Sequence, residues 1–240
     1  IFALFTVFYA YQLFYVVAAL WHDRKRVPTP EAKKLHKFAA VISARNESAV
    51  IGELVHSIKK QNYPAELLDV FVIADNCTDN TAAVAERAGA IVFERFNRQQ
   101  VGKGYALDYA FQRIEKEYGQ AQYEGYFIFD ADNLLDANYV AEMNKVFDSG
   151  YRVITSYRNS KNFDSNWISA GSALWFLREA KFLNNSRMIL GTNCAVSGTG
   201  FLVASDVIRA RGGWKYHLLT EDIQFSIDCA CEGERVVYCS

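Results

Sequence analysis

Short apolar runs alternate with amphipathic stretches from Lys37 onward, after one long apolar segment at the start of the chain. The runs predict buried strands near residues 38–43, 70–74, 90–93, 126–130 and 152–155. Between the runs, apolar residues recur at helical spacing, as in Ile51, Leu54, Val55 and Ile58. This alternation is typical of βαβ units. We therefore expect one α/β domain over 37–240 with a mainly parallel central sheet.

The pattern changes in the last third of the chain. The stretch from Trp167 to Leu190 is helical and aromatic, and 195–204 is strand and loop interrupted by glycines. The aromatic residues Trp167, Trp175 and Phe176 are most simply core or membrane-facing side chains.

Residues 1–21 are nearly uninterrupted in their apolar character, with Thr6 and Gln12 as the distinctly polar members. At about 1.5 Å per residue, such a helix crosses a bilayer core of about 30 Å. A secretory signal or a buried helix would also be apolar. A cleavable signal has its charges before the apolar region, whereas 24–26 is a basic cluster that follows it. The order favours one transmembrane helix.

The basic cluster also predicts orientation. Short loops rich in Lys and Arg remain cytoplasmic, so we expect an integral membrane protein, in the cell membrane, whose catalytic domain faces the cytoplasm. Residues 22–36 form a basic linker, and Lys33, Lys34 and Lys37 either lie against anionic headgroups or are ordinarily solvated. Because the chain starts without Met and ends at Ser240, we expect it to be an internal stretch of a longer polypeptide, with its C-terminal part missing.

Composition excludes some functions. The chain has 240 residues, 51% of them hydrophobic and 22% charged, with a net charge of −1. Nucleic-acid binding usually needs a concentrated basic face, so no nucleic-acid partner is expected. The five cysteines form no Cys-x-x-Cys pair and favour free thiols in a reducing compartment. Cys229 and Cys231 are expected on a packed helix face rather than at a metal.

Acidic residues occur where apolar runs stop. Asp75, Asp130 and Asp132 each follow a predicted strand, and Asp222 lies in a Leu-Leu-Thr-Glu-Asp sequence. Aspartate is also a preferred turn and cap residue, so each has a purely structural interpretation. Two carboxylates one residue apart repel unless a cation or solvent separates them, and their oxygens suit Mg²⁺ or Mn²⁺.

Six short motifs resemble, in order, those of inverting family 2 glycosyltransferases with a GT-A fold. They are Ile42-Ser43-Ala44-Arg45-Asn46-Glu47, Asp75-Asn76-Cys77-Thr78-Asp79, Gly102-Lys103-Gly104, Asp130-Ala131-Asp132, Ser197-Gly198-Thr199-Gly200-Phe201 and Thr220-Glu221-Asp222. The resemblance spans nearly everything from Lys37 onward and is strongest to membrane-bound synthases of poly-N-acetylglucosamine, cellulose or hyaluronan. Processive members carry a Gln-x-x-Arg-Trp motif beyond the last of these. The chain ends without it, which leaves processivity open.

The resemblance implies a role for each motif residue. It assigns the uridine to Ala44, Glu47 and Asp75, the nucleotide or phosphate to Lys103, the metal to Asp132, and support of metal or ribose to Asp130. It assigns Asp222 as the general base. It assigns the acceptor to Gly198, Thr199, Gly200, Phe201, Glu221 and, by stacking on a sugar ring, Trp214.

Electrostatic reasoning supports part of this assignment independently of the resemblance. A departing diphosphate gains negative charge, which a divalent cation stabilises as a Lewis acid, and Lys103 adds a point charge. An inverting displacement needs a carboxylate opposite the diphosphate, and Asp222 is distant in sequence from the metal acids. The structural alternative is that Thr220 caps a helix whose first turn holds two acids.

The favoured function is membrane-bound transfer of a sugar from a UDP-sugar, UDP-GlcNAc or UDP-glucose, to a glycan or lipid acceptor. The first alternative is a dolichyl- or polyprenyl-phosphate sugar transferase, whose product is a phosphate-linked lipid. A nucleotidyltransferase could use a similar sheet and carboxylate pair, because fold does not fix function. A catalytically silent scaffold is the last alternative.

Overall fold

A mixed sheet forms the centre of the protein, in a computed structural model that describes residues 2–23, 30–160 and 167–240. Across this described part, the strand order is β3-β2-β1-β4-β6-β5-β7. Every neighbouring pair is parallel except the two that involve β6. The strands are β1 (Phe38–Ala44), β2 (Leu68–Asp75), β3 (Ile91–Arg95), β4 (Gly125–Asp130), β5 (Val153–Ser156), β6 (Phe201–Ala204) and β7 (Val236–Cys239). The predicted α/β class with a mainly parallel sheet is confirmed.

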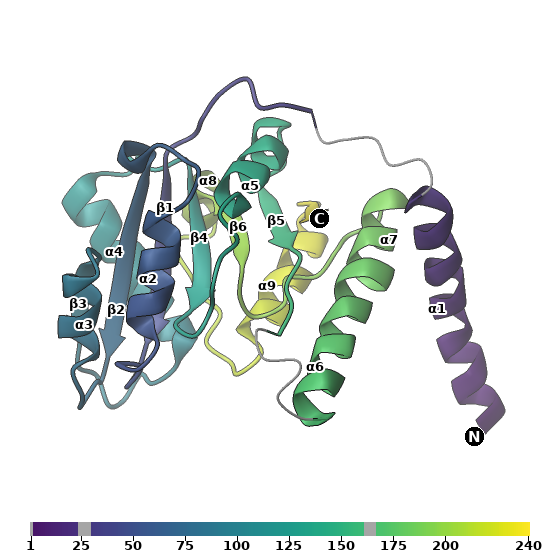
Figure 1. Cartoon of the computed structure of the whole chain (residues 1–240), viewed down its shortest axis with the longest axis horizontal. Coiled ribbons are helices and arrows are strands. Elements are labelled where there is room, and N and C mark those ends of the chain that lie inside the picture. Colours follow the sequence, from purple (N-terminus) through teal and green to yellow (C-terminus); the bar gives the residue numbers. More distant parts are fainter. Residues whose placement is uncertain (1, 24–29, 161–166) are drawn as a thin grey trace.

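Helices cover both faces of the sheet (Figure 1). Alternate strand residues point to opposite faces, so Ala39 and Val41 pack in one core and Ala40 and Ile42 in the other. The first core includes side chains of α4 (Lys103–Tyr118), α8 (Ser205–Ala210) and α9 (Glu221–Cys231). The second includes those of α2 (Ile51–Lys59), α3 (Thr81–Arg87) and α5 (Tyr139–Asp148).

The five predicted strands all exist, with ends shifted by no more than two residues. Strand β7 was not predicted, because four apolar residues in a row do not distinguish a strand from a helix or loop. Pairing with β5 makes this segment a strand. The five cysteines are free thiols, as expected. Cys229 is buried on α9 as predicted, whereas Cys231 is exposed and does not lie on a packed face.

The carboxyl ends of β1, β2 and β4 lie side by side. In register, Ala44 is opposite Ala74, and Ser43 is opposite Asp130. From β1 the chain runs outward through β2 and β3 on one side of the sheet, and then returns to β4 on the other side of β1. The ends of β1 and β4 therefore form a topological switch point. Open α/β sheets bind ligands in the crevice at such a point.

Helix α1 (Phe2–Asp23) lies beside a second long helix, as Figure 1 shows. The second helix is α6 (Trp167–Leu177), continued by the π-helical segment η2 (Arg178–Asn184) and by α7 (Asn185–Ile189), as the sequence predicted for this stretch. Within the described residues, α1 is the one helix long and apolar enough to cross a membrane. Its transmembrane role remains a prediction, and Arg24, Lys25 and Arg26 lie outside the described residues.

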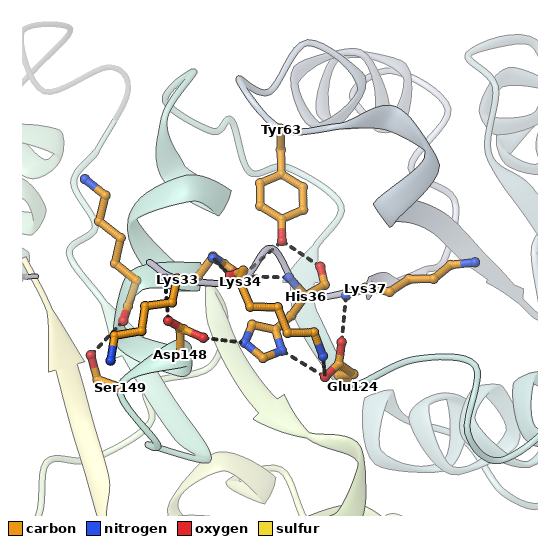
Figure 2. A network of polar contacts seen from close by, with 10 residues as sticks. Lys33, Lys34, His36, Lys37, Tyr63, Glu124, Asp148 and Ser149 are labelled. Carbon is orange, nitrogen blue, oxygen red and sulfur yellow. Dashed lines mark hydrogen bonds and ion pairs between the residues drawn. The ribbon is translucent and has the colours of Figure 1, made fainter. Parts of the chain in front are cut away.

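The segment before β1 is fastened to the domain through His36 (Figure 2). Its Nδ1 lies 2.9 Å from Glu124 Oε2, and its Nε2 lies 3.0 Å from Asp148 Oδ1. Lys34 Nζ donates to the same Glu124 oxygen at 2.7 Å, and the Lys33 backbone N–H donates to Asp148 Oδ2 at 2.7 Å. These contacts lie at the amino ends of the strands, opposite the crevice.

Candidate active site

Lys103 connects two of the predicted motifs. Its Nζ donates to Asp130 Oδ1 and to the Gly198 carbonyl, both at 2.5 Å. Lys103 begins α4 directly after Gly102, whose φ of +132° suits glycine, and Asp130 ends β4. The lysine therefore holds the glycine-rich loop against the carboxyl end of the sheet.

The loop formed by residues 197–201 also binds the last motif. The Gly198 N–H donates to Asp222 Oδ2 at 2.6 Å, and the Asp130 N–H donates to Thr199 Oγ1 at 2.8 Å. The Gly200 N–H continues the anchoring by donating to the Ile128 carbonyl at 2.9 Å. Asp130 and Asp222 are distant in sequence, but both are hydrogen-bonded to this loop.

Glu221 and Asp222 open helix α9 beside this lysine. Glu221 Oε1 lies 3.7 Å from Lys103 Nζ. Burial raises the pKa of Glu221, the Lys103 charge opposes this, and the charges of Asp222 and Asp130 raise the pKa further. Thr220 precedes the helix as predicted, but its side chain makes no capping hydrogen bond.

The Asp130 and Asp132 pair suits a divalent cation. Asp132 is exposed, and the Asp130 side chain is 42% exposed although one oxygen meets Lys103. Among the described residues there is no group of three or more metal-binding side chains. Mg²⁺ is commonly held by one or two carboxylates, with substrate phosphates and water as the other ligands. Two aspartates at the mouth of the crevice fit that donor set.

The residues predicted to contact uridine line the neighbouring strand ends. Asp75 is buried and pairs with Arg95 Nη1 at 2.6 Å, and the Ala44 side chain is buried at the end of β1. Glu47 is partly exposed, with its backbone N–H bound to Thr81 Oγ1 at 2.8 Å. They lie at the same carboxyl edge of the sheet as Asp130.

Two asparagines shape the loops after these strands. Asn46 and Asn76 have φ values of +57° and +52°, a left-handed conformation that asparagine tolerates better than most residues. The Asn46 side-chain oxygen accepts from the Thr78 N–H at 2.8 Å, and the Asn76 side-chain amide donates to the Asn97 carbonyl at 3.0 Å. The turns are thus tied to each other and to the loop before Lys103.

The position of Trp214 contradicts the prediction that this residue stacks on a sugar ring. The indole is fully buried, with ring centroids 5.0 Å from Phe225 and 6.2 Å from Phe111 and Phe201. A buried ring offers no face to a sugar, and packing in the core removes more apolar area from water than exposure at a site would. Phe201 is likewise 1% exposed, which leaves its backbone, not its ring, for contact with a ligand.

The sequence analysis missed two features of the site. Arg158 donates to the Ser197 carbonyl at 2.7 Å and pairs with Glu179 Oε2 at 2.9 Å. Gly104 packs so closely that an added Cβ would lie 1.9 Å from the Tyr216 carbonyl oxygen. An arginine just after a strand and a glycine between basic and aromatic residues were the signals, but neither identifies its partner.

Together, the mainly parallel sheet and the lysine with its carboxylates at the carboxyl end of β4 are those of an α/β transferase with a GT-A fold. The chain belongs to glycosyltransferase-like family 2, whose profile matches residues 36–240.

Relatives and solved structures agree with this class. The chain is 25% identical over 211 residues to the beta-monoglucosyldiacylglycerol synthase of Synechocystis sp., covering 85% of this chain and 41% of the relative. It is 37% identical over 94 residues to the 4,4'-diaponeurosporenoate glycosyltransferase of Staphylococcus aureus. That match covers 39% of this chain and 24% of the relative. The chain thus spans less than half the length of these relatives.

Among solved structures, the mannosyltransferase PcManGT from Pyrobaculum calidifontis, in complex with GDP-Man and Mn²⁺, has a TM-score of 0.71 at 19% identity. That similarity covers 99% of this chain and 64% of the other. S. aureus TarS in complex with UDP-GlcNAc has a TM-score of 0.61 at 18% identity, and the similarity covers 84% of this chain and 55% of the other. At these identities the similarity establishes the fold.

Proposed function

We propose that this chain is the donor-binding and catalytic part of a membrane-bound, inverting glycosyltransferase that uses a UDP-sugar. UDP-GlcNAc or UDP-glucose is the favoured donor, and the acceptor is a glycan or a lipid. The observation that carries the proposal is the position of the Gly198 loop. It is bonded to Asp222 on one side and, through Lys103, to Asp130 on the other.

The donor would occupy the crevice at the ends of β1, β2 and β4. Ala44, Glu47 and Asp75 would contact the uridine, with Asp75 held in place by its pair with Arg95. Solved neighbours of the same fold are complexed with GDP-Man and with UDP-GlcNAc, which supports a nucleotide-sugar donor. Comparing the affinities of UDP and GDP by calorimetry tests the choice of base.

The diphosphate would lie at Asp130 and Asp132, which would hold Mg²⁺ or Mn²⁺. The bound cation supplies Lewis-acid stabilisation of the leaving diphosphate. Lys103 provides a second positive charge at the same strand end, and the acids around it fix its ammonium group in place.

Asp222 would accept the proton of the acceptor hydroxyl. Its two oxygens accept from the Gly198 N–H at 2.6 Å and the Ile223 N–H at 2.8 Å, which fixes the orientation of the carboxylate. Gly198, Thr199, Gly200 and Glu221 surround this position and would bind the acceptor.

The deciding experiment measures products. Incubation with UDP-sugar, acceptor and Mg²⁺ or Mn²⁺ should release UDP and yield a glycoside of inverted anomeric configuration. A nucleotidyltransferase would instead transfer the nucleotide. A polyprenyl-phosphate transferase would give a lipid linked through phosphate, and a retained anomeric configuration would overturn the inverting mechanism.

The membrane part of the proposal has its own test. Helix α1 would anchor the chain, with the catalytic domain in the cytoplasm. A tag inserted near Ala32 should resist protease added outside intact cells and become cleavable after permeabilisation. Cleavage in intact cells would overturn the orientation.

A further inference from the structure

Helix α6 exposes a broad apolar surface. Trp167 is 83% exposed, Leu174 66% and Trp175 60%, although tryptophan and leucine usually bury most of their surface. The side chains come from one face, on which the small residues Gly171 and Ser172 leave a hollow of about 350 Å³ between the tryptophans. Exposed apolar surface of this kind typically marks a contact with another molecule or a membrane.

The composition of the long helix changes directly after α6, from apolar to mainly cationic. Residues 167–177 carry no charge, and the turns that follow contain Arg178, Lys181 and Arg187 together with one acid, Glu179, which pairs with Arg158. The Arg178 guanidinium lies 5.1 Å from the centroid of the Trp175 ring, which joins the two parts of the surface. Tryptophan beside arginine and lysine is the composition of helices that lie in the headgroup region of a bilayer.

The surface is also continuous with α1. Arg178 Nη2 donates to Gln12 Oε1 at 2.5 Å, and Ser186 Oγ donates to the Tyr15 carbonyl at 2.6 Å. Figure 1 shows α1 and the α6 to α7 helix side by side at one edge of the molecule. The long helix that α6 begins therefore packs, through η2 and α7, against the helix with the length and composition of a membrane span.

The C-terminal end of α6 contacts the candidate active site through Arg158. The Arg158 guanidinium lies 4.6 Å from the centroid of the Phe176 ring and pairs with Glu179, while its Nη1 binds the Ser197 carbonyl. A Cβ placed on Gly198 would lie 3.9 Å from both Arg158 Nη1 and Asp222 Oδ2. One arginine thus spans the distance between α6 and the surroundings of Asp222.

The residues next to Asp222 are apolar and exposed as well. Leu219 is 99% exposed, Leu218 62% and Ile223 50%. A sugar acceptor in water would meet polar side chains more favourably, whereas an acceptor with hydrocarbon chains gains by covering such a rim.

We propose that the exposed face of α6 binds the headgroup region of a lipid bilayer, so that the acceptor presented to Asp222 is a membrane lipid carrying a hydroxyl group. The naming of the acceptor rests on the proposed function, whereas the bilayer contact stands independently of it. Arg178 and Lys181, which follow α6 directly, keep this end of the helix at the headgroups, because a charged side chain in the hydrocarbon core is costly. Helix α6 therefore lies in the interface and does not enter the hydrocarbon core.

Tryptophan fluorescence tests the contact in the full chain. The four tryptophans are Trp21, Trp167, Trp175 and the buried Trp214. In a Trp21→Phe protein reconstituted in phosphatidylcholine and phosphatidylglycerol vesicles, lipids brominated near the headgroup should quench the emission. A matched protein that also carries Trp167→Phe and Trp175→Phe keeps Trp214 alone and should lose this quenching. Its unchanged Trp214 emission would show that it is folded.

Three results would overturn the proposal. The first is unquenched emission from vesicle-bound Trp21→Phe protein. The second is quenching by bromines at the chain ends but not near the headgroup, which would place α6 in the hydrocarbon core. The third is protection of both tryptophans by a concentration-dependent dimer, which would make the face a contact between copies.

The acceptor is tested with Trp167→Asp combined with Trp175→Asp. This variant should keep UDP affinity and lose most transfer to a diacylglycerol embedded in the vesicles. Full transfer by the variant would overturn the lipid-acceptor inference. Failure of the unmodified protein to bind UDP would instead contradict the proposed function, so the two failures are distinguishable.

Discussion

Gly198 donates its N–H to Asp222 Oδ2 at 2.6 Å, and its carbonyl accepts from Lys103 Nζ at 2.5 Å. One peptide segment therefore links Lys103 to Asp222, the two residues that we propose act on the diphosphate and on the acceptor. The arrangement gives each of the following variants a defined expected result.

Replacing Asp222 with Asn should abolish the proton acceptor while leaving donor binding intact. A lost general base costs about 10²–10⁴ in rate, or about 3–5 kcal/mol of transition-state stabilisation. The measurement is transfer rate at saturating UDP-sugar and metal. Asp206→Asn, which changes a first-turn acid of α8, is the matched control and should retain turnover. Equal rates in the two variants would return Asp222 to the structural role of a helix-start acid.

Replacing Asp132 with Ala should remove the metal-dependent part of UDP binding, because the assigned ligand of the cation is lost. Calorimetric titration of UDP with and without Mg²⁺ or Mn²⁺ measures the effect. Asp136→Ala, at an exposed position in the same loop, should bind UDP normally. Unchanged metal dependence in folded Asp132→Ala would remove this residue from the metal site.

Replacing Lys103 with Met should weaken UDP binding and loosen the Gly198 loop. A hydrogen bond to a charged group contributes about 1.5–3 kcal/mol, so a drop in affinity of about tenfold to a hundredfold is expected. Lys103→Arg keeps the charge and should recover part of the affinity. Normal UDP affinity in the Met variant would show that Lys103 anchors the Gly198 loop and does not contact the donor.

Replacing Gly104 with Ala should destabilise the fold around the site. The new Cβ would lie 1.9 Å from the Tyr216 carbonyl oxygen, so α4 or the 214–217 segment must move. A loss of about 1–3 kcal/mol is typical of such overpacking. Chemical denaturation measures it against Gly171→Ala, a helical glycine with open space at its Cβ. Similar stability of the two variants would contradict the close approach.

Acidification should release the segment around His36. Bonds from the Lys33 backbone and then from His36 lower the pKa of Asp148 below its ordinary value of 3.8. A carboxylate with a lowered pKa stabilises the folded state above its unfolded pKa, and this stabilisation is lost as pH falls through the folded pKa. Asp148→Asn should therefore melt earlier than the unmodified protein at pH 7, with the difference shrinking below pH 3.8.

The control for this pH effect is Glu66→Gln, at an exposed position. Its melting temperature should follow that of the unmodified protein throughout. A difference between Asp148→Asn and the unmodified protein that stayed constant down to low pH would exclude the loss of the Asp148 charge as the cause.

Local sequence determined much of this protein. Apolar runs specify buried strands because few other local structures bury consecutive side chains, and the order of runs and helical stretches therefore predicted the α/β class. Acids placed after those runs, such as Asp130, necessarily reach the carboxyl edge of a parallel sheet. The motif resemblance identified the family, whose profile matches residues 36–240.

Tertiary structure decided which side chains meet and which are buried. Trp214 looks like a sugar-stacking residue in sequence, but its ring fills the core between Phe111 and Phe225. The place of Arg158 just after a strand did not identify its partners, yet this residue joins α6 to the Gly198 loop. Burial and long-range pairing depend on how distant segments pack, and one-dimensional spacing does not contain that information. The three-dimensional fold alone brings Lys103, Gly198 and Asp222 together.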